Sequence, residues 1–242
     1  MNNIRRFYNS TSVIPKMKIL VFDTETTGLP KYRNASIFRT HDWPYVVQLS
    51  FMMYDAAQNE VLDVGDYLIK LPDGVEIEAG AQAVHGISKA KCDASGISMA
   101  DAYRHFNAAA QQADVFVAHN LMFDKRLMMV EARRLGIAHP FGEKGAWKPE
   151  FCTMKETTDM CKIEVKSEKT GETYYKYPKL AELHKHLFKY VPEGLHDSLA
   201  DILCCLRCYM QLRYGRDIIY DNRQIAALWR DKCVGGDVVK FH

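Results

Sequence analysis

The sequence lacks the segments that would direct it into a membrane or out of the cell. No run of apolar residues approaches the roughly 18 that a membrane-spanning helix needs. The N-terminal stretch carries Arg5 and Arg6 but has no apolar segment of the kind found in secretory signals. It also has no acidic residue, which leaves organelle targeting open, although a disordered tail over residues 1–16 is the favoured interpretation. We therefore expect an intracellular, cytoplasmic protein that does not enter a membrane, with association with the nucleoid left open.

An excess of one charge is also missing. The chain has 32 Lys and Arg against 30 Asp and Glu, so its net charge is +2. A charge this small does not argue for nucleic-acid binding, and any basic surface has to be local. The seven cysteines show no paired metal-ligand spacing. Three of them, Cys204, Cys205 and Cys208, lie in an apolar, helical stretch where a free cysteine packs as a small core residue. The cysteines therefore indicate a reduced, intracellular setting and argue against a zinc site.

What the sequence does contain is an alternation of strand and helix patterns. Its 242 residues, 48% apolar and 26% charged, suit one soluble globular domain. Apolar runs predict strands at residues 18–22, 46–54, 60–71, 115–118 and 151–154, the first three as an antiparallel meander. Helical periods predict helices at residues 98–111, 123–135, 179–189, 198–214 and 224–230. We expect an α/β fold in which a mixed sheet carries helices on its faces.

The domain boundaries follow from these patterns. Residues 1–16 form an N-terminal tail, residues 17–214 the main domain and residues 215–242 a C-terminal extension. Within the domain, residues 161–177 alternate polar and apolar side chains around Lys-Thr-Gly and predict a hairpin. Residues 161–189 contain seven lysines against four glutamates, with tyrosines interleaved, and such a surface suits single-stranded nucleic acid. An ordinary solvated hairpin, whose charges resist aggregation, is the slightly favoured alternative.

Two carboxylates stand at the end of the first predicted strand. Residues 22–28 read Phe-Asp-Thr-Glu-Thr-Thr-Gly, so Asp23 and Glu25 are two positions apart. Residues two apart in a strand point to the same side of the sheet. The two acids therefore converge on one point, where a cation or a shared proton has to relieve their repulsion.

Two further acids stand in helical segments. Asp124 lies in the first turn of a predicted helix, where the helix dipole alone would favour an acid. Asp201 lies in the helix at residues 198–214, whose two faces are both apolar, so its carboxylate needs a positive partner. A capping box formed by Ser198 and Asp201, and metal binding by Asp201, are equally consistent with this segment. His196 stands in the loop before the helix, either exposed to solvent or as the base that activates a water molecule beside a metal.

Taken in order, three segments resemble the motifs of the histidine-type DEDD exonuclease superfamily. They are residues 22–28, 119–124 and 196–201. Residues 84–88, Val-His-Gly-Ile-Ser, look like a substrate-loop segment of the proofreading branch, the exonuclease subunit of bacterial DNA polymerase. The resemblance covers about residues 18–214, and the ordered set of motifs is much more specific than the first motif alone.

The resemblance implies a ribonuclease H-like fold, which is a mixed β-sheet flanked by α-helices. It implies that Asp23, Glu25, Asp124 and Asp201 hold two divalent metal ions, Mg²⁺ with Mn²⁺ able to substitute. In this comparison Asp23 bridges the ions, Glu25 and Asp201 surround one, and Asp124 holds the other partly through water. His196 accepts the proton of the attacking water, and the product is a nucleoside 5′-monophosphate.

Six residues near the motifs are candidates for substrate contact: Thr26, Gly28, Leu29, His85, Asn120 and Phe123. The first three follow the acids of the first motif and suit the terminal nucleotide, with the leucine wedged against a base. The glycine alternatively permits a turn, the histidine is alternatively exposed, and the phenylalanine alternatively packs in the core. The asparagine either contacts the substrate or holds the active-site loop together.

These residues favour a metal-dependent 3′→5′ exonuclease that acts on single-stranded DNA or a frayed 3′ end. An exoribonuclease or short-oligonucleotide hydrolase is the alternative within the same fold. A non-catalytic nucleic-acid-binding module is the third hypothesis, and the complete set of five catalytic residues argues against it. The expected partners are single-stranded DNA or RNA 3′ ends, and a DNA polymerase as a partner stays open.

Overall fold

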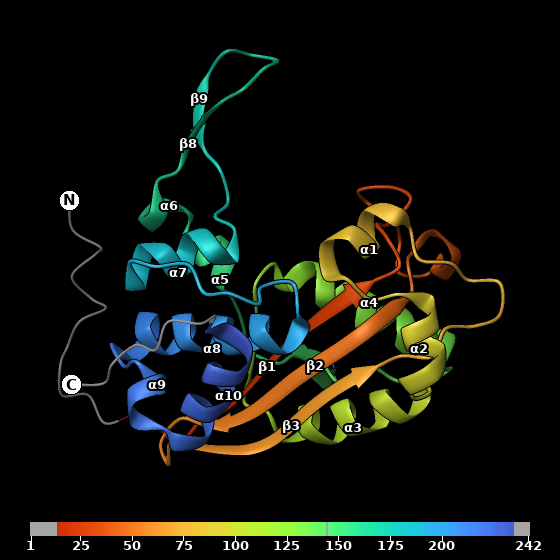
Figure 1. Ribbon diagram of the computed structural model, residues 1–242, viewed down its shortest axis with the longest axis horizontal. Helices are drawn as coiled ribbons and strands as arrows, with labels where there is room; N and C mark the ends of the chain where they lie inside the picture. The colour runs from red at the N-terminus through yellow and green to blue at the C-terminus, as the bar shows by residue number, and fades with distance from the viewer. Residues whose placement is uncertain (1–13, 144, 235–242) are drawn as a thin grey trace.

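The computed structural model describes residues 14–143 and 145–234, and only the backbone of residue 143. The predicted N-terminal tail up to residue 13 and the end of the C-terminal extension from residue 235 therefore lie outside the described residues. Among the described residues, five strands form one mixed sheet in the order β3-β2-β1-β4-β7 (Figure 1). The strands are β1 (Lys18–Thr26), β2 (Val46–Asp55), β3 (Glu60–Leu68), β4 (Val115–Ala118) and β7 (Glu150–Cys152). The first three pair antiparallel, whereas β4 runs parallel to β1 and β7 parallel to β4.

Helices cover both faces of this sheet, as predicted (Figure 1). One face carries α3 (Met99–Gln112) and α4 (Leu121–Arg134). The other face carries α8 (Ser198–Tyr214), and α7 (Leu180–Phe188) and α10 (Arg223–Cys233) pack against α8. Within residues 14–143 and 145–234, no helix is both long and apolar enough to span a membrane.

The alternation of β1 separates two hydrophobic cores. Its odd-numbered residues, from Ile19 on, face α8, and its even-numbered residues, from Leu20 on, face α3 and α4. Because both faces are covered, the strand is apolar almost without interruption until its first acid. By the same alternation, Asp23 and Glu25 lie on the α8 side of the sheet.

Helix α8 is buried on both sides, as its sequence predicted. A buried arginine, Arg207, ties it to the C-terminal extension. Its guanidinium group makes two hydrogen bonds to the carboxylate of Asp217, at 2.8 and 2.6 Å. The same group lies 4.8 Å from the centre of the Trp229 ring in α10. The extension after residue 214 is therefore packed onto the main domain through α8.

Shorter elements fill the connections between these layers. They are η2 (Thr40–Asp42), α1 (Ala79–His85), α2 (Lys89–Ser95), β5 (Gly142–Glu143), β6 (Ala146–Trp147), α5 (Thr153–Glu156), α6 (Thr158–Cys161), β8 (Glu164–Lys166), β9 (Thr173–Tyr175) and α9 (Ile218–Asp221). The predicted hairpin is confirmed as β8 and β9, which project away from the body of the molecule (Figure 1).

Several predicted boundaries are wrong. β1 continues to Thr26, so the two acids lie within the strand rather than after it. The third strand ends at Leu68. Ile69 still donates its backbone N–H to the carbonyl of Val47 in β2, at 2.9 Å, but pairs as an isolated bridge with Ile97. The fifth strand ends at residue 152, where α5 begins. The helices α1, α2, α5, α6 and α9 were not predicted, because fewer than two helical turns show no recognisable period.

Candidate active site

Carboxylates from two elements meet beside the end of β1. Asp23 and Glu25 lie on the α8 side of the strand, and Asp201 comes from the first turn of α8. One oxygen from each of these three side chains lies within 4.8 Å of the other two. The strand alternation and the helix start that were read from the sequence therefore bring these three predicted ligands to one point.

Hydrogen bonds fasten the start of α8 to β1. Ser198 Oγ donates to the backbone oxygen of Asp23 at 3.0 Å. The N-cap is Asp197, whose Oδ1 accepts two backbone N–H groups of the first turn at 3.1 and 3.2 Å. The alternative that Ser198 and Asp201 form a capping box is therefore wrong. The carboxylate of Asp201 does not cap the helix, and it contacts the acid cluster and the loop before the helix.

Burial and mutual repulsion make the clustered carboxyl groups weak acids. Burial raises the pKa of Asp23 to about 6. Burial, followed by repulsion from Asp23 and Asp201, raises the pKa of Glu25 to about 9. Burial and the charge of Asp23 raise the pKa of Asp201 to about 8. Closely spaced carboxylate oxygens of this kind are the donors that a hard divalent cation prefers, and a cation would relieve the repulsion that now favours protons.

Asp124 approaches the same strand from the opposite face. It is buried in the first turn of α4, and its Oδ1 accepts the backbone N–H and the hydroxyl of Thr24 at 3.1 and 2.7 Å. Burial, followed by repulsion from Asp23, raises its pKa well above the usual range for an aspartate. In the part of the chain that the structure describes, the close cluster holds three of the four predicted ligands, and Asp124 is their electrostatic neighbour. The helix dipole alone does not account for the two bonds from Thr24.

His196 stands in the loop that leads into α8. It is exposed, and its φ of 76° is uncommon for a residue other than glycine. Its backbone N–H points at both carboxylate oxygens of Asp201, at 3.4 and 3.3 Å, which are long hydrogen bonds. The loop is therefore tied to the acid cluster through its backbone, and the imidazole is accessible to a ligand.

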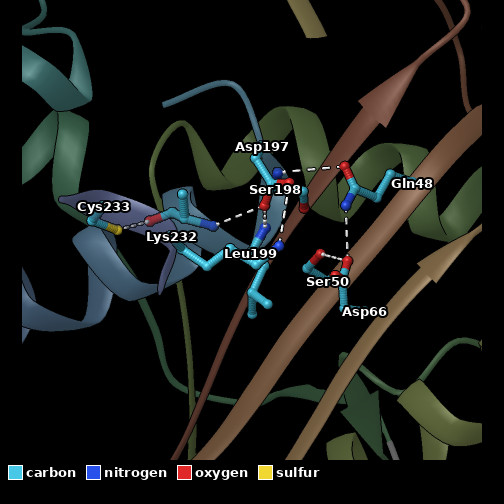
Figure 2. Close-up of polar contacts among 9 residues, drawn as sticks. Gln48, Ser50, Asp66, Asp197, Ser198, Leu199, Lys232 and Cys233 are labelled. Carbon is cyan, nitrogen blue, oxygen red and sulfur yellow. Dashed lines mark hydrogen bonds and ion pairs between the residues drawn. The ribbon is translucent and has the colours of Figure 1, made fainter. Parts of the chain in front are cut away.

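The C-terminal helix contacts this loop as well (Figure 2). The backbone N–H of Glu193 donates to the carbonyl of Cys233 at 3.1 Å. Lys232 Nζ lies 3.8 Å from the carboxylate of Asp197. The end of α10 thus lies against the loop of His196, a relationship that no local pattern in the sequence could have revealed.

A polar row beneath the start of α8 was also missed. Gln48 and Ser50 of β2 stand opposite the two acids of β1 in the strand register. Both side chains donate to Asp66 Oδ1 at 2.8 Å, and Gln48 Oε1 accepts the backbone N–H of Ser198 at 3.5 Å (Figure 2). The available signal was two polar residues, two positions apart, in an otherwise apolar strand. They carry the polar face of the site from β1 to β2 and β3.

The residues just after the acids shape a turn. Thr26 Oγ1 donates to the carbonyl of Gly28 at 2.6 Å. A Cβ at Gly28 would lie 2.4 Å from the carboxyl group of Glu78, so a side chain here would displace that group. Leu29 is 76% exposed. Of these three predicted substrate residues, the leucine is therefore the one whose side chain is open to a base.

The other three predicted substrate residues have different surroundings. His85 Nδ1 accepts the backbone N–H of Ile87 at 3.0 Å, so its Nε2–H donates to the carbonyl of Thr26 at 3.1 Å. Partial burial lowers the pKa of this histidine. Its hydrogen bond to Thr26 ties α1 to the end of β1. Asn120 is exposed and left-handed at the start of α4. Phe123 is half-buried against the core. Their contact with substrate remains a prediction.

Residues 20–209 match a family model, named RNase T, that describes an exonuclease. Among solved structures, the chain is similar to product-bound exonuclease I, with 16% identity and a TM-score of 0.61 over 85% of this chain and 46% of that one. It is similar to E. coli exonuclease I in complex with a dA16 oligonucleotide, with 15% identity and a TM-score of 0.59 over 85% and 43% of the two chains. It is also similar to the zinc-bound complex of E. coli exonuclease I with single-stranded DNA, with 16% identity and a TM-score of 0.62 over 85% of this chain and 42% of that one.

These structures confirm the predicted fold, a mixed sheet flanked by helices of the ribonuclease H-like kind. The chain spans less than half the length of the exonuclease I chains that it matches. A comparison with curated protein sequences finds no match.

Proposed function

We propose that this chain, which belongs to the exonuclease family matched over residues 20–209, is a divalent-metal-dependent 3′→5′ exonuclease. Its substrate would be the 3′ end of single-stranded or frayed DNA, and its product a nucleoside 5′-monophosphate. The observation that carries the proposal is the meeting of Asp23, Glu25 and Asp201 within 4.8 Å. Their mutual repulsion has to be relieved by protons or by a bound cation, and a group of oxygen ligands this close suits a divalent cation.

The donor set fits hard divalent ions. Asp23, Glu25 and Asp201 would hold one ion, Asp23 would be shared with a second, and Asp124 would hold the second partly through water. Mg²⁺ is the expected ion, and Mn²⁺ suits the same oxygen ligands. When bound, the ions would stabilise the charge that develops on the attacking and leaving oxygens of a phosphodiester.

His196 is the proposed general base. Neutral imidazole is the side chain best suited to accept a proton from water near pH 7. The backbone contact of its loop with Asp201 limits how far the loop can move from the acids. Leu29, exposed at the end of β1, would pack against the terminal base.

Single-stranded DNA is the preferred substrate. The similar exonuclease I structures include complexes with a dA16 oligonucleotide and with single-stranded DNA, which supports this choice. The resemblance of residues 84–88 to the proofreading branch supports DNA as well, and would extend to a polymerase partner and to a role in proofreading or repair. An exoribonuclease is the alternative, which the same assay distinguishes.

The test uses 5′-labelled single strands of DNA and of RNA with Mg²⁺. We expect the DNA to shorten as a ladder from its 3′ end, a chelator to stop the reaction, and Mg²⁺ or Mn²⁺ to restore it. The Asp23→Asn variant should lose nearly all activity. Cleavage of a circular strand, or full cleavage in excess chelator, would overturn the proposal, and faster shortening of RNA would assign the alternative.

A further inference from the structure

The loop that joins β1 to β2 concentrates exposed cations and aromatic rings. Residues 29–41, called here the aromatic–basic loop, contain no acidic residue. They expose the basic side chains of Lys31, Arg33 and Arg39. They also expose two large rings, Tyr32 at 52% and Phe38 at 69%. Exposed rings grouped with cations are the surface chemistry that suits single-stranded nucleic acid.

Helix α4 fixes the backbone of this loop. Arg126 donates to the carbonyl of Ala35. Arg134 donates to the carbonyls of Thr40 and Trp43 at 2.7 and 2.8 Å. Charged hydrogen bonds to two carbonyls of the loop and to one just after it hold the loop in one shape. The exposed rings and cations are therefore presented by a pre-organised backbone, which lowers the entropy lost when a ligand binds.

The charge of this region is larger than that of the whole chain. The region counted here is residues 29–42, the arginines of α4 that contact them, and the glutamate of α4 that pairs with Arg134. It contains six cations and two acids. The cations are Lys31, Arg33, Arg39, Arg126, Arg133 and Arg134, and the acids are Asp42 and Glu131. Both acids are buried and paired, one with Arg39 and one with Arg134. Six cations less two acids leave +4 here, against +2 for the whole chain.

We propose that the aromatic–basic loop binds the single strand on the 5′ side of its reacting 3′ end. The proposal rests on the function proposed above. The loop begins at Leu29, four residues after Glu25, and extends from the end of β1 (Figure 1). In this proposal, a strand whose terminal nucleotide lies at the acids continues past the end of β1 onto the loop. The exposed cations would contact phosphates, and Tyr32 and Phe38 would stack on unpaired bases.

Unpaired bases are the ligand that this chemistry selects. In the order Lys31-Tyr32-Arg33, a ring stands between two cations. A base can stack on this ring only if the face of the base is uncovered. In a duplex the faces of the bases are covered by their neighbours. Arg133 lies 4.0 Å over the ring of Phe38 and supports it from the side of α4.

The β8–β9 hairpin offers a matched control. Residues 161–177 also expose rings, including Tyr174 at 55%, but they contain four lysines against three glutamates, a local charge of only +1. The hairpin therefore has the aromatic surface without the charge. Removing Lys166 and Lys169 from it changes the net charge of the chain as much as removing Lys31 and Arg33 from the aromatic–basic loop.

The experiment measures binding of a 5′-fluorescein-labelled single DNA strand by anisotropy, as a function of salt. All variants carry Asp23→Asn, so that no strand is cut. Lys31→Ala with Arg33→Ala should lower the slope of log affinity against log salt by about 1.4, since each phosphate contact on a single strand contributes about 0.7. Tyr32→Ala should weaken binding about tenfold, at the lower end of the range for one lost base stack. Lys166→Ala with Lys169→Ala, and Tyr174→Ala, should bind as the parent does.

Two results would overturn the proposal. Equal effects of the loop and hairpin variants would show general electrostatics only, and an unchanged salt slope would leave the loop as a surface for a protein. Binding is measured without cleavage, so the two proposals can fail separately. If the chain with its native Asp23 cuts no strand while the binding variants show the expected slopes, the proposed activity is refuted and binding by the loop is supported. The substituted side chains are exposed, so unchanged thermal unfolding is the check on folding.

Discussion

The backbone oxygen of Lys232 lies 2.0 Å from the point that a Cβ on Gly194 would occupy. Gly194 also has a φ of 74°, which side chains other than glycine rarely adopt. The loop that carries His196 therefore passes against the last turn of α10 with no room for a side chain. The C-terminal extension lies beyond the part of the chain that matches the family model, and here it contacts the loop of the candidate active site.

Gly194→Ala should reduce the turnover number by tenfold or more. The alanine would be strained by about 1–2 kcal/mol in the left-handed conformation, and would also push the loop off α10. Gly136→Ala is the matched control, because Gly136 has a φ of 68° and a Cβ added there would meet no heavy atom of a distant residue within 4 Å. Gly136→Ala should lower the free energy of unfolding in urea through the same backbone strain, and it should keep full activity. Equal turnover in the two variants would mean that the contact with α10 does not matter for catalysis.

The metal-free protein should lose stability as the pH rises from 7 to 9. Glu25 and Asp201, with pKa values raised to about 9 and 8, keep protons in the folded state that the unfolded chain has already released. The folded state therefore binds more protons, and its stability falls with pH by on the order of 1 kcal/mol per pH unit for each proton involved. Urea unfolding in a chelator at several pH values measures this. The window stays above pH 7 because His119 and His184, whose pKa values burial lowers to about 4, favour unfolding at acid pH.

The same experiment with Mg²⁺ should remove most of the pH dependence, because the ion stabilises the ionised carboxylates. Asp201→Asn should reduce the slope in the chelator, and it should also reduce the stabilisation by Mg²⁺. Asp159→Asn, at an exposed position on α6 outside the acid cluster, should change neither. A slope unaffected by Asp201→Asn would mean that the cluster does not hold these protons.

The parts of the site that could be predicted are those with a local period. Asp23 and Glu25 follow from strand alternation, whereas the helical segment around Asp201 was equally consistent with a capping box and with metal binding. The order of the motifs added Asp124, His196 and Asp201 to the predicted site, and it also predicted the ribonuclease H-like fold. The acids of the first motif were placed after the strand rather than within it, because polar residues usually mark strand ends and here the cluster itself interrupts an apolar run.

The parts that could not be predicted depend on contacts between distant segments. Gln48 and Ser198 are 150 residues apart in the sequence, and the whole of α8 lies between Gly194 and Lys232 in the sequence. Nothing in either local sequence indicates the other. The sequence left open a capping box with Ser198 as the N-cap, whereas the N-cap is Asp197. Both are good capping residues, and only the geometry distinguishes them.

Gln48→Leu should lower activity by several-fold while the protein stays folded. The leucine keeps the volume of the side chain but removes the acceptor for the backbone N–H of Ser198 and one donor to Asp66, at a cost of about 1 kcal/mol for each lost hydrogen bond. We expect the loss in the turnover number, because the start of α8 carries Asp201. Gln224→Leu, at an exposed position on α10, is the control and should leave the kinetics unchanged. A loss confined to KM would argue against a role for Gln48 in positioning α8.

His196→Ala should slow turnover by about 10²–10⁴-fold, the usual effect of losing a general base, with stabilisation by Mg²⁺ retained. In the parent chain the rate should rise with pH, because only a neutral imidazole can accept a proton from water. That rise should disappear in the variant. His196→Asn separates the base from the backbone, because asparagine tolerates the left-handed conformation found at this position. It should be as slow as the alanine variant, and His186→Ala, an exposed histidine on α7, should match the parent. If the asparagine variant keeps the rate and the pH dependence of the parent, His196 serves only the shape of the loop, and the proton of the attacking water is accepted elsewhere.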